Sequence, residues 1–194
     1  MPFVRVEDGE TITRRERREV VILAEGPDLT VTWSRYAAGE AGPDLHVHRE
    51  HTDAFYVLDG ELTFLVGPAA ERVPVGTGGF VAVPPNVVHT YVCEAVETRW
   101  LNMHAPDAGF ADYMRGLRDG TGVAFDNFGR PEDGGLPATV AIVSGPGEGE
   151  RRGDELVKVA LPELLVAERS DGRADGACFE LGGGRVLQLR TPAA

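Results

Sequence analysis

Two histidines flank a valine in the stretch DLHVHREHTDAFYVLDGEL, which covers residues 44–62. In an extended strand, side chains two residues apart leave the same face, so His46 and His48 are expected to point together. Two imidazoles that face one volume are typical of a transition-metal site. A pair of surface histidines on an edge strand is the alternative, and an H-x-H pattern by itself favours neither interpretation.

A carboxylate could complete such a site, and two acids stand close by in the sequence. Strand parity alone favours Glu50, which would share the face of His46 and His48 if the strand ran straight. The residues REHT at 49–52 look more like a turn, and Asp53 begins the next apolar run. These considerations by themselves leave the choice between Glu50 and Asp53 open.

The segment GTGGFVAVPPNVVHTYVC at residues 76–93 offers a third imidazole. His89 shares a strand face with Tyr91 and Cys93. Together the two segments resemble the paired motifs of the cupin superfamily, in which H-x-H precedes an acid and a glycine, and a glycine precedes proline, a turn residue, histidine and asparagine. The residues at these positions are His46, His48, Asp53 and Gly60 in the first motif, and Gly78, Pro84, Asn86, His89 and Cys93 in the second.

The resemblance covers about residues 28–104 and implies a cupin, a double-stranded β-helix or jelly-roll barrel. One cupin barrel followed by a helix looks like a quercetinase-like monocupin. The resemblance implies that one divalent transition metal (Fe, Ni, Mn, Cu or Zn) is bound and that Asp53 is also the catalytic base. The implied ligands are His46, His48, Asp53 and His89.

Three positions depart from the family pattern. Asp53 stands where the family has glutamate, and because aspartate is one methylene shorter, weaker or water-mediated ligation is expected. Asn86 stands where the family has a turn glycine, a mild change because asparagine tolerates the left-handed conformation. Cys93 replaces a closing asparagine and is expected to be a small buried hydrophobe.

An open metal position walled by apolar side chains predicts an enzyme acting on a small organic substrate. The quercetinase-like arrangement favours a dioxygenase of an aromatic or enolic compound. A metal-dependent isomerase or lyase and a non-enzymatic small-ligand-binding cupin are the alternatives. The candidate wall residues are Trp33, Tyr36, Phe55, Phe64, Tyr91 and Met103. Of the other histidines, His51 is expected to face solvent from a loop and His104 to make a structural hydrogen bond.

Short extended segments must position these residues. Runs rich in β-branched and aromatic residues occur at 20–24, 29–36, 45–48, 54–58, 61–66, 79–83, 87–93 and 98–104. They predict an all-β sandwich or barrel, with Asp59-Gly60 as a two-residue hairpin turn. Beyond them, apolar residues at helical spacing predict a minor helix over 107–120 that stops at Gly120.

We expect one domain over residues 1–194, with the barrel core at about 28–104 and a helix plus a C-terminal strand extension over 105–194. Residues 126–137 and 144–155 have the composition of loops. Residues 156–170 and 177–190 look like a further strand pair. This tail carries no histidine, so we expect it to cover a sheet edge or to form a homodimer.

Charge and composition limit the partners. Nineteen basic and thirty-one acidic residues give a net charge of -12, which repels nucleic-acid phosphates and anionic lipid. No apolar stretch approaches the length of a membrane span, and the N-terminus lacks the apolar core of a signal peptide. With only two cysteines and no C-x-x-C pattern, we expect a cytoplasmic protein with a small-molecule substrate, although one disulfide is not excluded.

Overall fold

The computed structural model describes residues 5–136, 164–166, 176–181 and 185–190. The chain divides into two compact units, residues 1–151 and 152–194. The single domain expected over 1–194 stays a prediction.

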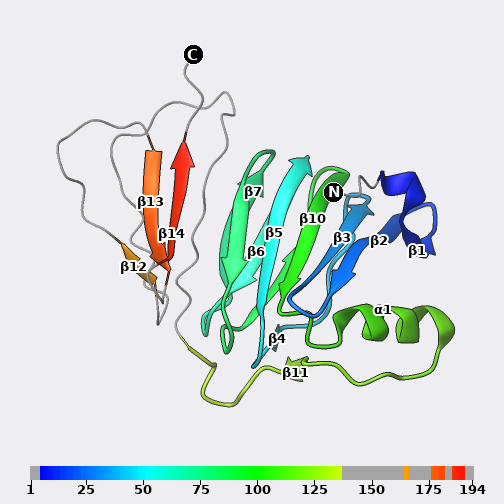
Figure 1. The fold of residues 1–194 in the computed structure, drawn as a ribbon. Coiled ribbons are helices and arrows are strands. Elements are labelled where there is room, and N and C mark those ends of the chain that lie inside the picture. Colours follow the sequence, from blue (N-terminus) through cyan, green and yellow to red (C-terminus); the bar gives the residue numbers. More distant parts are fainter. Residues whose placement is uncertain (1–4, 137–163, 167–175, 182–184, 191–194) are drawn as a thin grey trace. The chain divides into compact units, whose positions relative to one another are not determined.

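The described part of the first unit is mostly β-structure (Figure 1). After a short 3-10 helix at Val6–Asp8 come β1 (Glu10–Arg14), β2 (Arg18–Gly26), β3 (Leu29–Tyr36), β4 (His46–Val47), β5 (Thr52–Asp59), β6 (Glu61–Val66), β7 (Glu71–Gly76), β8 (Phe80–Val83), β9 (His89–Val92), β10 (Thr98–Ala105), α1 (Phe110–Asp119) and β11 (Phe128–Gly129). One antiparallel sheet has the order β1-β2-β3-β10-β5-β8 and the other β11-β4-β9-β6-β7. The predicted all-β jelly roll with a minor helix is confirmed.

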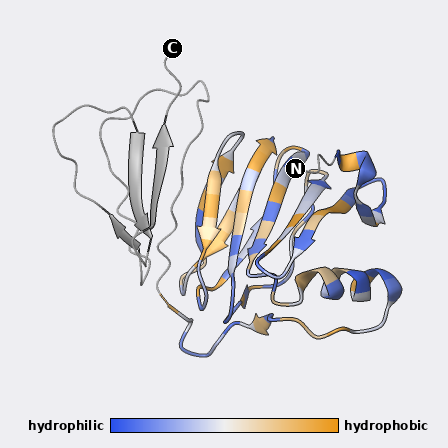
Figure 2. Ribbon diagram, viewed as in Figure 1, coloured by the Kyte–Doolittle hydropathy of each residue, from blue (hydrophilic) through white to orange (hydrophobic). Residues whose placement is uncertain are grey.

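Alternating burial decides which side chains enter the barrel. In β10, Trp100, Asn102 and His104 are buried while the residues between them are half-buried. The same two-residue period runs along β3. Figure 2 shows the corresponding bands of hydrophobic and hydrophilic residues along the strands. The apolar core includes Phe55 and Phe64, whereas polar residues are buried around the histidines.

The predicted hairpin at Asp59-Gly60 is wrong. The strands on either side of it, β5 and β6, belong to different sheets, so this turn carries the chain from one sheet to the other. Gly60 has a φ of +84°, and a Cβ atom there would lie 2.5 Å from the carbonyl oxygen of Glu97. The close approach of two backbone segments, rather than a hairpin, therefore requires glycine at this position.

The predicted helix is confirmed as α1, which lies at the same end of the strands as β4 and β11 (Figure 1). It ends at Gly120, whose φ of +67° places it in the left-handed conformation common after helices. Arg115 and Arg118 bind the carboxylate of Glu10 at 2.8 and 2.7 Å and tie the helix to β1. In the part of the chain that the structure describes, no helix is long and apolar enough to span a membrane.

The described part of the second unit is an antiparallel sheet of β12 (Leu164–Val166), β13 (Gly176–Leu181) and β14 (Arg185–Arg190). The expected strand pairing in the tail is confirmed for these residues. The loop predicted at 144–155 lies outside the described residues. A role for this unit in covering a sheet edge stays a prediction.

Candidate metal centre

All five histidines of the chain gather around one imidazole. The ring of His48 has its centroid within 4.1 to 5.8 Å of the other four rings, those of His46, His51, His89 and His104. Each of the five is at most 6% exposed. The rings come from β4, from the turn after it, from β9 and from β10, so the barrel brings together segments that are far apart in the sequence.

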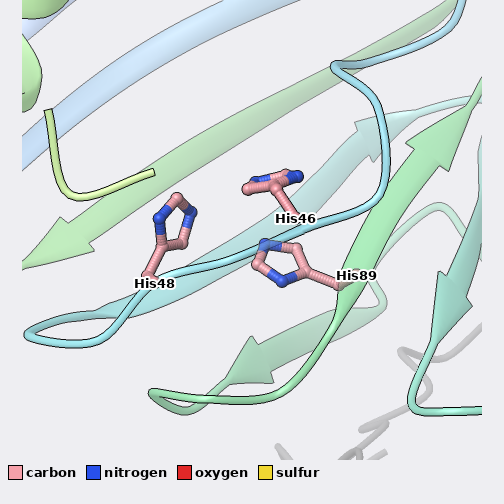
Figure 3. A group of neighbouring side chains, drawn as sticks. All are labelled: His46, His48 and His89. Atoms are coloured by element: carbon pink, nitrogen blue, oxygen red, sulfur yellow. The ribbon is translucent and has the colours of Figure 1, made fainter. Parts of the chain in front are cut away.

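The first group is the triad that the motifs predict. β4 pairs with β9 so that His46 lies directly opposite His89. Figure 3 shows the rings of His46 and His48 leaving one segment, and the ring of His89 leaving its neighbour, toward a common volume. The ligand nitrogens of the three lie within 4.8 Å of one another, a separation that one metal ion can bridge.

Main-chain carbonyls fix the tautomers of this triad. In each ring the Nδ1–H group donates to a carbonyl oxygen: His46 to Asp44 at 2.8 Å, His89 to Val87 at 3.0 Å, and His48 to Asp126. Because a carbonyl only accepts, the neutral rings of His46 and His48 carry their lone pairs on Nε2, whereas Nε2 of His89 lies within hydrogen-bond distance of Oδ2 of Asp53 at 3.3 Å. Among the described residues, the buried Nε2 of His48 has no hydrogen-bond partner. A buried acceptor without a hydrogen-bond partner is unfavourable, and a bound metal ion would satisfy it. The three imidazoles therefore fit a metal ion.

The structure places Asp53, and not Glu50, beside the triad. Asp53 is 4% exposed, and its Oδ2 lies 3.3 Å from Nε2 of His89 and 3.7 Å from Nε2 of His48. Burial would raise the pKa of Asp53, but the neighbouring His104, His48 and His89 outweigh it and hold this pKa well below its usual range. Glu50 is exposed in the turn. Ligation by Asp53 stays a prediction.

The expectation that His51 faces solvent is wrong. Its side chain is buried, Nδ1 donates to Oδ2 of Asp126 at 2.8 Å, and Nε2 lies 2.9 Å from Nδ1 of His104. The same carboxylate accepts the backbone N–H groups of Arg49 at 2.9 Å and Glu50 at 2.7 Å. Burial would raise the pKa of Asp126, but these donors outweigh it and lower the pKa. Asp126 therefore holds the turn at 49–51, in which the side chain of His51 is buried while Arg49 and Glu50 are exposed.

His104 makes the hydrogen bonds expected of it. It lies opposite Asp53 in the register of β10 and β5, and its Nε2 is 3.2 Å from Oδ1 of Asn102. The amide nitrogen of Asn102 donates to Oδ1 of Asp53 and to the carbonyl of Ala54. The ring of Phe110, at the start of α1, stacks on His104 with a centroid separation of 3.5 Å. The helix thus covers this side of the histidine cluster.

Burial changes the basicity of these rings unequally. Burial, reinforced by His89 and His48, lowers the pKa of His46 to about 3. Burial also lowers the pKa of His104 to about 4. For His48, burial lowers the pKa, but the nearby carboxylate of Asp53 outweighs it and raises the pKa overall. At neutral pH, His46 and His104 are therefore neutral, the form in which an imidazole can bind a metal.

A cavity of about 580 Å³ opens onto His46, His48, Asp53 and His104. One part of its wall is mainly apolar and is formed by Phe110, Tyr113, Met114, Leu117 and Phe125. Other lining side chains are the polar Thr32, Ser34 and Asn102, and the arginines Arg14, Arg15, Arg18 and Arg118. The candidate metal centre therefore has access to a space with both apolar and hydrogen-bonding walls.

The predicted wall residues separate into three pairs. Tyr36 and Tyr91 line the cavity. Phe55 and Phe64 are fully buried in the core instead. Trp33 and Met103 are half-buried and lie on the faces of β3 and β10 that point away from the barrel interior, so their assignment to the wall is wrong. Phe110, Tyr113 and Phe125 also line the cavity, and the helical spacing of this segment gives no sign of that contact.

Two of the departures from the motif are accommodated locally. Asn86 has a φ of +68°, the left-handed conformation expected of it, and its N–H donates to the carbonyl of His48 at 2.7 Å. Cys93 is a free cysteine buried in the core, as expected, and burial raises the pKa of its thiol to about 11. The turn residue therefore helps to hold the first histidine segment, and the cysteine is a neutral apolar group.

An antiparallel two-sheet barrel with paired histidines at β4 and a third on β9 defines a cupin. Residues 32–104 match the family model described as a cupin domain. Residues 32–104 are therefore a cupin domain, and the chain is similar to a quercetinase over part of its length. It is 31% identical over 124 residues to quercetin 2,3-dioxygenase of Bacillus subtilis, a match that covers 61% of this chain and 35% of that protein.

Two solved structures also match part of the chain. KdgF from Halomonas sp. is 19% identical, with a TM-score of 0.49 over 55% of this chain and 94% of that chain. An RmlC-like cupin from Shewanella frigidimarina is 24% identical, with a TM-score of 0.47 over 54% of this chain and 89% of that chain.

Proposed function

We propose that this cupin is a mononuclear metal-dependent dioxygenase of a small aromatic or enolic compound. The observation that carries the proposal is a set of three imidazoles beside an aromatic-walled cavity, each held by a hydrogen bond from Nδ1 to a main-chain carbonyl. The similarity to a quercetin 2,3-dioxygenase supports this reaction class.

His46, His48 and His89 would hold one divalent transition metal (Fe, Ni, Mn, Cu or Zn), with Asp53 as a fourth ligand or as a base. Imidazole nitrogens and a carboxylate oxygen form a borderline donor set that suits these ions. When bound, the ion supplies Lewis acidity and an open coordination position for a chelating substrate and dioxygen.

Asp53 would accept a proton from the substrate. Its Oδ1 accepts the amide of Asn102, while Oδ2 points toward His48 and His89. The lowered pKa keeps the carboxylate ionised at neutral pH but also makes it a weak base. It therefore suits an acidic hydroxyl, such as an enol or a phenol, better than a carbon acid.

The cavity fits a flat organic molecule. Its volume of about 580 Å³ lies in the usual range of small-molecule sites, roughly 300–1,000 Å³. Phe110, Tyr113 and Phe125 offer ring faces, and Thr32 and Ser34 offer hydroxyl groups to orient polar substituents. Phe110, which stacks on His104, would keep water away from that imidazole.

Metal analysis and oxygen uptake test the proposal. Protein purified without chelators should contain one transition metal per chain and should consume oxygen with flavonols or simpler enols. His48→Ala should abolish both, whereas Arg72→Gln, a change at an exposed arginine, should affect neither. Protein that neither retains nor takes up a metal would overturn the proposal. Turnover without oxygen would indicate an isomerase or lyase, and ligand binding unchanged in His48→Ala would indicate a binding protein.

We also propose that the protein is a cytoplasmic homodimer that pairs through the outer face of β3, β10 and β5. Trp33, Leu101 and Tyr56 are cross-strand neighbours on this face. Tyr56 and the nearby Leu58 are among the exposed large hydrophobic residues. A partner copy would cover this apolar surface.

A further inference from the structure

A second histidine triad lies beside the first. The ligand nitrogens of His48, His51 and His104 are within 4.8 Å of one another, and all three side chains are buried. His48 belongs to both triads, whereas His51 and His104 are not part of either cupin motif. The three rings enclose a common space.

Hydrogen bonds on the outer sides of His51 and His104 fix where their lone pairs point. Nδ1 of His51 faces a carboxylate oxygen of Asp126, which only accepts, so this nitrogen carries a hydrogen. Nε2 of His104 faces Oδ1 of Asn102. The amide nitrogen of Asn102 already donates to two oxygen atoms, so its Oδ1 must be the acceptor and Nε2 of His104 also carries a hydrogen.

The two remaining nitrogens, Nε2 of His51 and Nδ1 of His104, then direct lone pairs at each other across 2.9 Å. Two lone pairs at this separation repel unless a cation lies between or beside them. Two metal–nitrogen bonds of about 2.05 Å at a right angle place their nitrogens about 2.9 Å apart. The separation therefore suits a metal ion as well as a shared proton.

A third donor completes the set. Nε2 of His48 is buried without a hydrogen-bond partner among the described residues, and its Nδ1–H donates to the carbonyl of Asp126. Each of the three rings thus has one nitrogen anchored to an oxygen atom and the other free, as is usual for histidines that bind metals. Asp126 supplies two of these anchors, one from its backbone and one from its side chain.

We propose that His48, His51 and His104 form a second position for a divalent transition metal, alternative to the first because a single Nε2 of His48 can bind only one ion. This inference depends on the proposed metal but not on the proposed oxygenase activity. The second position has only imidazole ligands, and Phe125 covers it, with ring centroids 5.2 to 5.7 Å from those of the three histidines. His51 does not line the cavity, so an ion there is less accessible to a substrate.

Cobalt binding to the full-length chain tests the proposal. The wild-type protein, freed of metal, should bind one Co²⁺ per chain. His46→Ala/His89→Ala removes two ligands of the first position and should still bind one Co²⁺, about tenfold or more weakly because the carboxylate-assisted position is lost. Adding His51→Gln to this variant should abolish binding. His51→Gln alone, the matched control, should bind Co²⁺ nearly as well as the wild type.

Absence of Co²⁺ binding by the folded double variant would overturn the proposal, and so would binding that His51→Gln leaves unchanged. If His51→Gln leaves the binding unchanged, the remaining Co²⁺ site is formed by His48 and Asp53. The contact between His51 and His104 is then explained by a shared proton. If the alanine variant does not fold, His46→Gln/His89→Gln, which retains side-chain volume and polarity, is measured instead. Failure of the proposed function gives a different result. In that case the wild-type protein itself would bind no metal or would consume no oxygen.

Discussion

Asp126 accepts a hydrogen bond from Nδ1 of His51 at 2.8 Å, although the two residues are 75 positions apart in the sequence. The same carboxylate binds the backbone of the turn between His48 and His51, and its own carbonyl binds His48. A residue beyond the region of cupin similarity therefore orients two histidines of the site.

Asp126→Asn should weaken metal binding. An amide has one oxygen acceptor in place of two, so a buried N–H of the turn or of His51 would lose its partner. We expect a loss of about 1–3 kcal/mol in the free energy of unfolding and about 10- to 100-fold in metal affinity. Urea unfolding of the metal-free protein and Co²⁺ titration measure these effects. Asp133→Asn, at an exposed loop residue, is the control, and equal affinities in the two variants would contradict the role of Asp126.

Asp53→Asn should reveal whether this carboxylate is a ligand. Removing a negative charge 3.3 to 3.7 Å from two ligand nitrogens should lower metal affinity at least about tenfold and abolish turnover. Glu50→Gln makes the same chemical change at the exposed acid of the turn and should leave affinity unchanged. The reverse order of the two affinities would transfer the ligand role to Glu50.

The metal-free protein should lose stability as the pH falls from about 6.5 toward 4. The folded-state pKa is about 3 for His46 and about 4 for His104, below the value of 6.5 for a free histidine. The unfolded chain therefore binds protons in this window that the folded chain does not. The free energy of unfolding should fall by up to ~1.4 kcal/mol per pH unit for each histidine, and the full contribution is present above pH 6.5.

Urea unfolding at several pH values, followed by tryptophan fluorescence, measures this slope. His104→Gln should reduce the slope by the share of one histidine. A stability independent of pH across this window would show that the two rings are protonated in the folded state.

Gly60→Ala should destabilise the barrel. The left-handed backbone and the carbonyl of Glu97, 2.5 Å from the added Cβ, should together cost about 2 kcal/mol or more. Gly76→Ala is the matched control, because a Cβ there has no neighbour within 4 Å. Thermal unfolding of both variants compares them, and equal midpoints would refute the close approach at Gly60.

Tyr56→Glu should convert the proposed homodimer into a monomer. A buried, unpaired carboxylate at the centre of an apolar interface is strongly unfavourable. Val96→Glu introduces the same charge at another exposed hydrophobic residue and should leave the dimer intact. Light scattering coupled to size-exclusion chromatography gives the masses. A wild-type protein that is already monomeric would remove the basis of this proposal.

The first histidine triad could be predicted because it follows from strand parity and motif spacing, which are local properties. His46, His48 and His89 need only an extended backbone and a pairing of β4 with β9 to converge. Alternation along β10 likewise places His104 inside the barrel. The motif spacing selected Asp53 over Glu50, and the turn at 49–51 that interrupts the strand explains why parity alone did not.

The misassigned features depend on contacts that local patterns do not contain. His51 is buried because Asp126, far along the chain, supplies the acceptor for its ring. Asp59-Gly60 has hairpin composition, but the two strands it joins hydrogen-bond in different sheets. β7 was missed because Pro74, a residue unfavourable in sheets, interrupts its pattern on the edge strand.

The segment after β10 contributes residues that contact and orient the histidine cluster. Phe110 covers His104, Asp126 fastens the turn, and Leu136 donates a hydrogen bond to the carbonyl of Asn86 at 3.0 Å. A chain shortened at residue 104 would keep every predicted ligand and lose this scaffolding. Transfer of the site to another barrel would therefore require the 32 residues from 105 to 136 as well as the two histidine motifs.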